Sequence, residues 1–156
     1  MKHLILMMVA VFAISMSAQA QKLSKEEKAA AKAQKEAETS ALMKNLFQSK
    51  NFQFVPTEVQ TKTGGSVNIN KYEYTRVRPD SFIVRMSQAP SIDVPKYELV
   101  TNEATKTGYI FTVKVEAGGS TNTISISVNS KTGFAQMRIK SNKAEELIYK
   151  GSIREN

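Results

Sequence analysis

The residues of this chain that could do chemistry are carboxylates, lysines, hydroxyls and tyrosines, because it has no cysteine and its one histidine is His3. These residue types exclude a Ser-His-Asp triad, a cysteine nucleophile and a zinc site with His or Cys ligands, as well as the usual haem and iron–sulfur ligands. We therefore expect no metal and no cofactor. Acid–base chemistry by paired carboxylates is the one familiar catalytic route left.

The carboxylates do not form a recognisable catalytic pair. Asp80 follows Pro79 in a predicted turn, and Asp93 lies in a predicted loop flanked by prolines. Glu145 and Glu146 would point to opposite faces of an extended segment. We therefore name no catalytic residue and expect that the protein is not an enzyme. An enzyme that uses carboxylates alone is the third-ranked alternative.

The triplet Lys-Thr-Gly begins at Lys62, Lys106 and Lys131. It is one element of penicillin-binding enzymes, which also need a Ser-x-x-Lys nucleophile. No serine of this chain has lysine three residues further on. We interpret the triplets as turns between β-strands, because glycine favours turn conformations.

Several aromatic residues could line a ligand cleft or stack on sugar rings, although the chain has no tryptophan, the best residue for that purpose. They are Tyr72, Tyr74, Tyr109, Phe111, Phe134 and Tyr149. Alternating aromatics on strands are more often core residues or cross-strand pairs. As candidate ligand-binding residues we take Tyr72, Tyr74, Tyr109 and Phe111.

Residues 1–20 have the pattern of a secretory signal peptide. Lys2 precedes an apolar run from Leu4 to Ile14, and Ala18-Gln19-Ala20 has the small-x-small pattern of a cleavage site. The run is too short to cross a bilayer, which takes about 20 residues. We expect cleavage near Ala20, a periplasmic or secreted protein, and no transmembrane segment or lipid anchor in residues 21–156.

Residues 21–48 are predicted to form one helix. Ser24 and Glu27 have the spacing of a capping box, and alanine, lysine and glutamate dominate up to Glu38. We expect this first half to be exposed. Apolar residues at helical spacing predict that the second half docks on the rest of the chain. They are Leu42, Met43, Leu46 and Phe47.

Residues 49–156 are predicted to form an antiparallel β domain of eight or nine strands. Pro56 indicates an edge position or a bulge, a phase change near Asn70-Lys71 indicates a bulge or turn, and residues 87–96 are predicted to be a loop. The end of the chain alternates most clearly, which predicts a four-stranded meander. Its strands are 109–115, 124–128, 134–140 and 147–153.

The predicted fold is α+β and mostly antiparallel: a curved meander sheet, as a half-open barrel or sandwich, with one N-terminal helix. In the strand 109–115, parity predicts that one side of the sheet buries a row of four bulky residues, while Thr112 and Lys114 face outward. The four are Tyr109, Phe111, Val113 and Val115.

The charge of the chain is basic, with a formal net charge of +8 at pH 7. A positive charge favours acidic partners such as anionic lipids, polyanionic glycans or nucleic acid. The basic residues are scattered rather than gathered in a run, so we expect no nucleic-acid partner. The simpler interpretation is that the charge keeps the protein soluble.

Short motifs along the chain resemble a known family. They are Leu42-x-x-x-Leu46, Asn51-Phe52-x-Phe54, Gly64-Gly65-Ser66-Val67-Asn68-Ile69, Tyr72-x-Tyr74 and Asp80-Ser81. The chain resembles the domain of unknown function 4251, small exported proteins found mainly in Bacteroides-type Gram-negative bacteria. The resemblance implies a periplasmic or secreted α+β domain dominated by antiparallel sheet, and it supplies no catalytic residue and no established ligand. The compact stretch from Ser87 to Pro95 is shorter than the loop expected there.

Two functions of different kinds follow from these expectations. The first is a non-catalytic binding or envelope-accessory module. The alternative is a carrier that holds a small apolar ligand in the concave sheet, as curved sheets can. A filled interior would favour the module, and a pocket lined by the four candidate aromatics would favour the carrier.

Overall fold

The computed structural model describes residues 24–60, 65–69 and 72–156. Over these residues it has one helix, α2 (Lys25–Ser49), and a ten-stranded sheet. The chain divides into two units between Gln34 and Lys35. The strands are β1 (Phe52–Gln60), β2 (Ser66–Asn68), β3 (Tyr74–Val77), β4 (Phe82–Arg85), β5 (Ile92–Val94), β6 (Glu98–Ala104), β7 (Gly108–Ala117), β8 (Ser120–Asn129), β9 (Phe134–Ser141) and β10 (Leu147–Arg154).

The described part of the first unit is the beginning of helix α2, and it has the predicted capping box. The Ser24 amide donates to a carboxylate oxygen of Glu27 at 2.7 Å, and the Glu27 amide donates to the Ser24 hydroxyl at 3.1 Å. These reciprocal bonds satisfy two backbone donors that a helix start leaves without partners.

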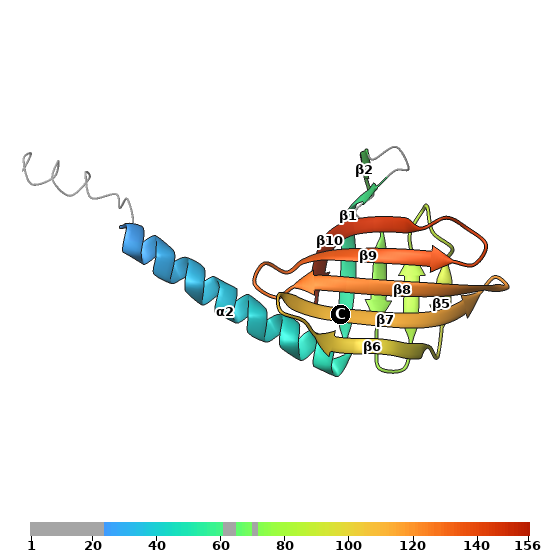
Figure 1. Ribbon diagram of the computed structural model, residues 1–156, viewed down its shortest axis with the longest axis horizontal. Coiled ribbons are helices and arrows are strands. Elements are labelled where there is room, and N and C mark those ends of the chain that lie inside the picture. Colours follow the sequence, from blue (N-terminus) through green and yellow to red (C-terminus); the bar gives the residue numbers. More distant parts are fainter. Residues whose placement is uncertain (1–23, 61–64, 70–71) are drawn as a thin grey trace, which may run out of the picture. The chain divides into compact units, whose positions relative to one another are not determined.

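The second unit is built on a single antiparallel sheet in the order β5-β4-β3-β1-β10-β9-β8-β7-β6, with β2 paired to β1. The sheet curls into a half-barrel, so strands β6 to β10 cross in front of β3, β4 and β5 in Figure 1. This architecture confirms the predicted α+β class with a curved antiparallel sheet.

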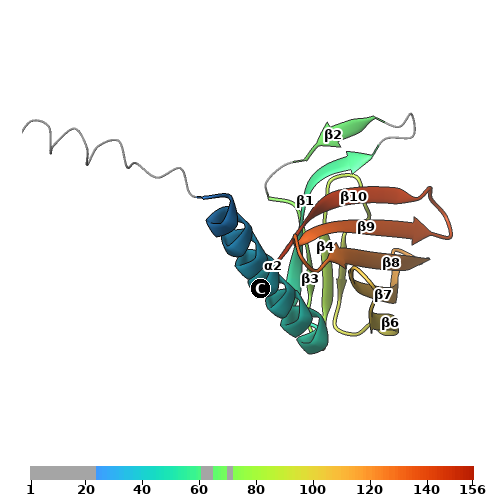
Figure 2. The same ribbon diagram turned by 60° about the vertical axis from the view of Figure 1, so that its left-hand side comes forward.

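Strand β1 bends where it changes partners. On one side, the first residues of β1 pair with β3 and its last residues pair with β2, which lies beyond the rest of the sheet (Figure 2). On its other side, β1 pairs with β10 along both halves. The pairing with β10 shifts between Pro56 and Glu58, which confirms a bulge at this proline. Gly151 is opposite Pro56, and a Cβ there would lie 2.1 Å from the Val55 carbonyl oxygen. Only glycine lets the two strands approach this closely.

Two sequence-based predictions need correction. The sheet has ten strands rather than eight or nine. Residues 87–96 are not only a loop, because β5 pairs with β4 within them and the Ile92 side chain is fully buried. Pro90 and Pro95 lie outside this short strand and so do not interrupt its pairing. The predicted phase change near Asn70-Lys71 lies outside the described residues.

The inner face of the curled sheet holds the core. In β7, Phe111, Val113 and Val115 are buried while Lys114 is exposed, as parity predicted. The largest fully buried side chains are Tyr149, Phe47, Phe52, Phe54, Phe82, Phe111, Met43, Ile92, Ile124, Ile126, Met137 and Ile139. They come from α2 and seven of the strands, which explains how one sheet and the end of one helix form a continuous core.

The end of helix α2 contributes a narrower apolar stripe than predicted. Met43, Leu46 and Phe47 are buried, and the Phe47 ring stacks on Phe52 with centroids 4.5 Å apart. Leu42 is 38% exposed and is not part of the packed stripe. A stripe at i, i+3 and i+4 from Met43 leaves Leu42 at its margin, which is the reason for this difference.

Candidate functional site

Two of the four candidate ligand-binding residues lie in one aromatic cluster on the inner face. The Tyr109 ring stacks on Phe47, with centroids 5.5 Å apart, and the Phe111 ring meets Phe52 edge-on at 5.6 Å. Phe111 is fully buried and Tyr109 is partly buried. Both rings therefore contribute to the core.

The other two lie elsewhere. In β3 the buried positions are Thr75 and Val77, so Tyr74 is on the opposite, outer face, with the Arg76 guanidinium carbon 5.1 Å from its ring centroid. Tyr72 is 73% exposed. The structure therefore brings Tyr109 and Phe111 together and leaves Tyr72 and Tyr74 outside their cluster.

Two further aromatic residues, Tyr97 and Phe82, belong to the inner cluster. The Tyr97 ring meets Phe82 edge-on at 5.9 Å and Phe111 at 6.0 Å, and its hydroxyl donates to the Arg78 carbonyl oxygen at 2.9 Å. Burial, and secondarily the negative charge of Asp80, raise the pKa of Tyr97. These rings pack against one another on the inner side of the sheet.

One polar group in the interior is unusual. Tyr149 of β10 is fully buried, and among the described residues its hydroxyl has no hydrogen-bond partner. Burial raises the pKa of Tyr149 to about 12, and the Glu73 carboxylate adds to this shift. The side chain is therefore a neutral, unionised phenol at physiological pH.

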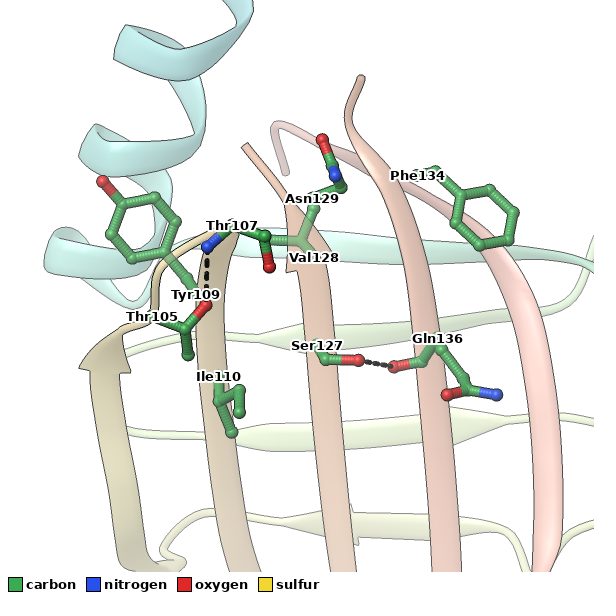
Figure 3. A pocket seen from close by; sticks show the side chains of 9 residues that line it. All are labelled: Thr105, Thr107, Tyr109, Ile110, Ser127, Val128, Asn129, Phe134 and Gln136. Atoms are coloured by element: carbon green, nitrogen blue, oxygen red, sulfur yellow. Dashed lines mark hydrogen bonds between the residues drawn. The ribbon is translucent and has the colours of Figure 1, made fainter. Parts of the chain in front are cut away.

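A hollow of about 280 Å³ lies where β7, β8 and β9 meet their connecting turns; Ile110, Ser127, Phe134 and Gln136 reach it from the outer face, and Tyr109 and Val128 border it from the inner face (Figure 3). We call it the outer hollow. Its lining residues are Thr105, Thr107, Tyr109, Ile110, Ser127, Val128, Asn129, Phe134 and Gln136. None of these side chains carries a charge, and only Tyr109 was among the four candidates.

The floor of the outer hollow is a cross-strand row. Ile110, Ser127 and Gln136 are register partners on β7, β8 and β9, and the Ser127 hydroxyl donates to the Gln136 backbone carbonyl at 3.4 Å. Phe134 lies two residues before Gln136 on the same face and is 53% exposed. In Figure 3 the Ser127 hydroxyl lies between Ile110 on one side and Phe134 on the other, and the Gln136 amide lies on the Phe134 side.

The turns beside the hollow are held by their own side chains. The Thr105 hydroxyl accepts from the amides of Thr107 and Gly108, at 3.3 and 3.1 Å. The Asn129 side-chain oxygen accepts from the amides of Lys131 and Thr132, at 3.0 and 3.1 Å. This fixes Asn129 by its oxygen, so its amide nitrogen is the group that can donate to a ligand.

The chemistry of the outer hollow suits binding rather than catalysis. Its hydroxyls and amides can donate and accept hydrogen bonds, and it contains no carboxylate, lysine or histidine to move a proton at neutral pH. Within the described residues, no group of three or more His, Cys, Asp or Glu side chains could hold a metal ion.

Phe134 was not among the four candidate ligand-binding residues predicted from the sequence, although the alternation of β9 indicates its position. Phe134 shares its parity with Gln136 and Arg138, whereas the buried residues of β9 are Ala135, Met137 and Ile139. An aromatic residue that shares the phase of the polar residues of a strand is expected to lie on the exposed face, and this phase is the signal that could have placed Phe134 there.

Comparison with known proteins shows the fold and not the function. No family profile matches the chain, and no curated protein matches it. Among solved structures, it is similar to the crystal structure of a DUF4251 family protein from Bacteroides eggerthii, with a TM-score of 0.63 and 11% sequence identity over 75% of this chain and 87% of that one. The fold implied by the sequence resemblance is therefore confirmed. Across residues 24–60, 65–69 and 72–156, no helix is both long and apolar enough to span a membrane.

Proposed function

We propose that this protein is an exported, non-catalytic binding module that takes its ligand in the outer hollow. The observation that carries the proposal is the contrast between the two faces of the sheet. The inner face is filled by the chain's own aromatic and aliphatic side chains. The outer face has a hollow in which Phe134 is 53% exposed beside the uncharged polar groups of Ser127 and Gln136.

The filled inner face weighs against the carrier. An apolar ligand in the concave sheet would have to displace rings that already contact one another, such as Phe47, Phe52 and Phe111. Packed cores do not yield such space without a large loss of stability. One observation keeps the carrier as the second candidate: an interior ligand with a polar end would give the buried Tyr149 hydroxyl a partner.

The proposal of export rests on residues 1–20, which lie outside the described residues. The apolar run from Leu4 to Ile14 and the motif Ala18-Gln19-Ala20 support cleavage after Ala20. Intact-mass measurement of the protein from envelope fractions tests this. We expect a chain that begins at Gln21; the mass of all 156 residues, or recovery from the cytoplasm alone, would overturn it.

A screen that favours no ligand class tests the binding site. The ¹⁵N-labelled protein is mixed with a library of small neutral compounds, and amide shifts are recorded. We expect shifts to concentrate at Thr107, Ser127 and Gln136 and to vanish in Phe134→Ala. A matched control is Tyr72→Ala, which removes an exposed aromatic side chain that does not line the hollow. Shifts concentrated at Phe111 and Tyr149 would instead support the carrier, and no shifts in the hollow would refute the module.

A further inference from the structure

We propose that the outer hollow binds a pyranose unit of a neutral carbohydrate, with the Phe134 ring as the platform on which the sugar stacks. This inference rests on the proposed function, because it assigns a ligand class to the same hollow. It draws on three properties of the hollow: its lack of charge, its apolar sides, and the kind of hydrogen-bonding groups between them.

The lack of charge selects an uncharged ligand. The chain has a formal net charge of +8, yet all the residues that line the hollow are neutral. At one end of the cross-strand row, Lys150 of β10 is the register partner of Gln136, and its ammonium group forms a salt bridge with Glu58 at 2.7 Å. At the other end, Glu103 of β6 is the register partner of Ile110. Lys131, in the adjacent turn, is 3.5 Å from Glu36. An anionic ligand would find no free cation in the lining, and burying its charge there would be unfavourable.

The apolar sides select a ligand with an apolar face. Phe134 leaves 53% of its surface exposed on the outer side of the sheet, and Ile110 lies across the hollow from it (Figure 3). The C–H face of a pyranose ring can cover such a ring and remove its surface from water. A purely apolar ligand fits less well, because it would cover the Ser127 hydroxyl between the two apolar side chains and the Gln136 amide beside Phe134, and both groups would lose water without gaining partners.

The polar groups select a ligand that both donates and accepts hydrogen bonds. The Gln136 amide and the Thr107 hydroxyl can do both, the Ser127 hydroxyl can accept, and Asn129 offers its amide nitrogen. Sugar hydroxyls have the same dual character. The volume of about 280 Å³ is at the small end of ligand sites, so the hollow suits one ring, with its open side free for the rest of an oligosaccharide.

The test is a titration with four neutral hexasaccharides: α-linked glucose, β-linked glucose, α-linked mannose and β-linked N-acetylglucosamine. Calorimetry measures the affinity for each sugar, and amide chemical-shift changes identify the residues at which it binds. We expect at least one to bind with shifts at Ser127 and Gln136. Phe134→Ala should weaken binding by about tenfold, the loss of one aromatic contact, whereas Phe134→Trp should retain or strengthen it. Tyr72→Ala should change the affinity by less than about twofold.

The outcomes separate this inference from the proposed function. If none of the four sugars binds while small neutral compounds still shift the amides of the hollow, the carbohydrate assignment is wrong and the binding site stands. The assignment is also wrong if a short peptide binds there in place of the sugars. If a sugar binds but Phe134→Ala has full affinity and an unchanged melting temperature, both the assignment and the site are wrong.

Discussion

At the scale of single residues, Tyr149 shows that a buried position can lack the partners it needs. Its side chain is fully buried, and Tyr149 is the register partner of Met137 on β9 and of Val59 on β1. The Met137 sulfur, a weak acceptor, already receives a hydrogen bond from the Thr75 hydroxyl at 3.4 Å. Among residues 24–60, 65–69 and 72–156 the Tyr149 hydroxyl has no hydrogen-bond partner, so it loses water on folding without a bond in return.

Replacing Tyr149 by phenylalanine should cost no stability. The substitution keeps the ring and removes an unpartnered buried hydroxyl, so we expect a free energy of unfolding that is unchanged or higher by up to about 1 kcal/mol. Urea denaturation measures it. A decrease in the free energy of unfolding of about 2 kcal/mol or more would mean that the hydroxyl forms a strong hydrogen bond.

The same phenol makes stability depend on alkaline pH. Its folded pKa of about 12 is above the ordinary value of 10.0. Between these values the unfolded chain loses the proton while the folded chain keeps it, so stability is full below pH 10 and falls as the pH rises towards 12. Between pH 9 and pH 11.5, the free energy of unfolding obtained from denaturation curves should decrease less steeply with pH in Tyr149→Phe than in the wild type. Identical slopes would contradict the raised pKa.

Gly151 illustrates the opposite case, a residue fixed by the backbone around it. A Cβ at this position would lie 2.1 Å from the Val55 carbonyl oxygen and 2.8 Å from the Pro56 Cα. Backbone atoms cannot move aside without breaking the pairing of β1 and β10. Gly151→Ala should therefore destabilise the protein by about 2 kcal/mol or more, as measured by thermal denaturation. Gly119→Ala is the control for a glycine in an open turn, where only backbone strain opposes the change. An effect at Gly151 no larger than at Gly119 would contradict the close approach.

At the scale of elements, the last turns of helix α2 should stabilise the second unit through three residues. Met43, Leu46 and Phe47 are buried, and the Phe47 carbonyl accepts from the Asn102 side chain of β6 at 3.0 Å. Phe47→Ala should cost about 3–5 kcal/mol and Leu46→Ala about 2–5. Leu42→Ala, on the partly exposed margin, should cost less than about 1 kcal/mol. Chemical denaturation of the three variants measures these losses in the free energy of unfolding. Equal losses would contradict the conclusion that Leu46 and Phe47 are packed while Leu42 is at the margin.

The sequence predicted the elements best where local signals were strong. The β7–β10 meander follows from strict alternation and glycine turns; Gly118 and Gly119 both have positive φ between the paired ends of β7 and β8. Strand β5 was missed because three residues between prolines carry too little pattern to show that Ile92 is in the core. The outer hollow was missed because it needs the register of three strands, which no local pattern contains.

At the scale of the whole molecule, charge and binding are expected to be independent of each other. The chain has a formal net charge of +8, but the residues that line the outer hollow are all neutral. Binding in the hollow should therefore change by less than about twofold between low salt and 0.5 M salt, since screening acts on charged contacts. Affinity that falls steeply with salt in calorimetric titrations would indicate that Lys114, Arg138 and other basic side chains carry the interaction.

We propose that this protein meets its ligand on the outer face of the sheet, at Phe134. The most direct measurement is an amide shift map of the ¹⁵N-labelled protein titrated with the soluble envelope fraction and the culture medium of the cells that make it, because an exported protein meets its ligand in these compartments and no ligand class has to be chosen. We predict shifts centred on Thr107, Ser127 and Gln136 that disappear in Phe134→Ala and persist in Tyr72→Ala. Shifts centred on Phe111 and Tyr149, or a map unchanged by Phe134→Ala, would contradict the account.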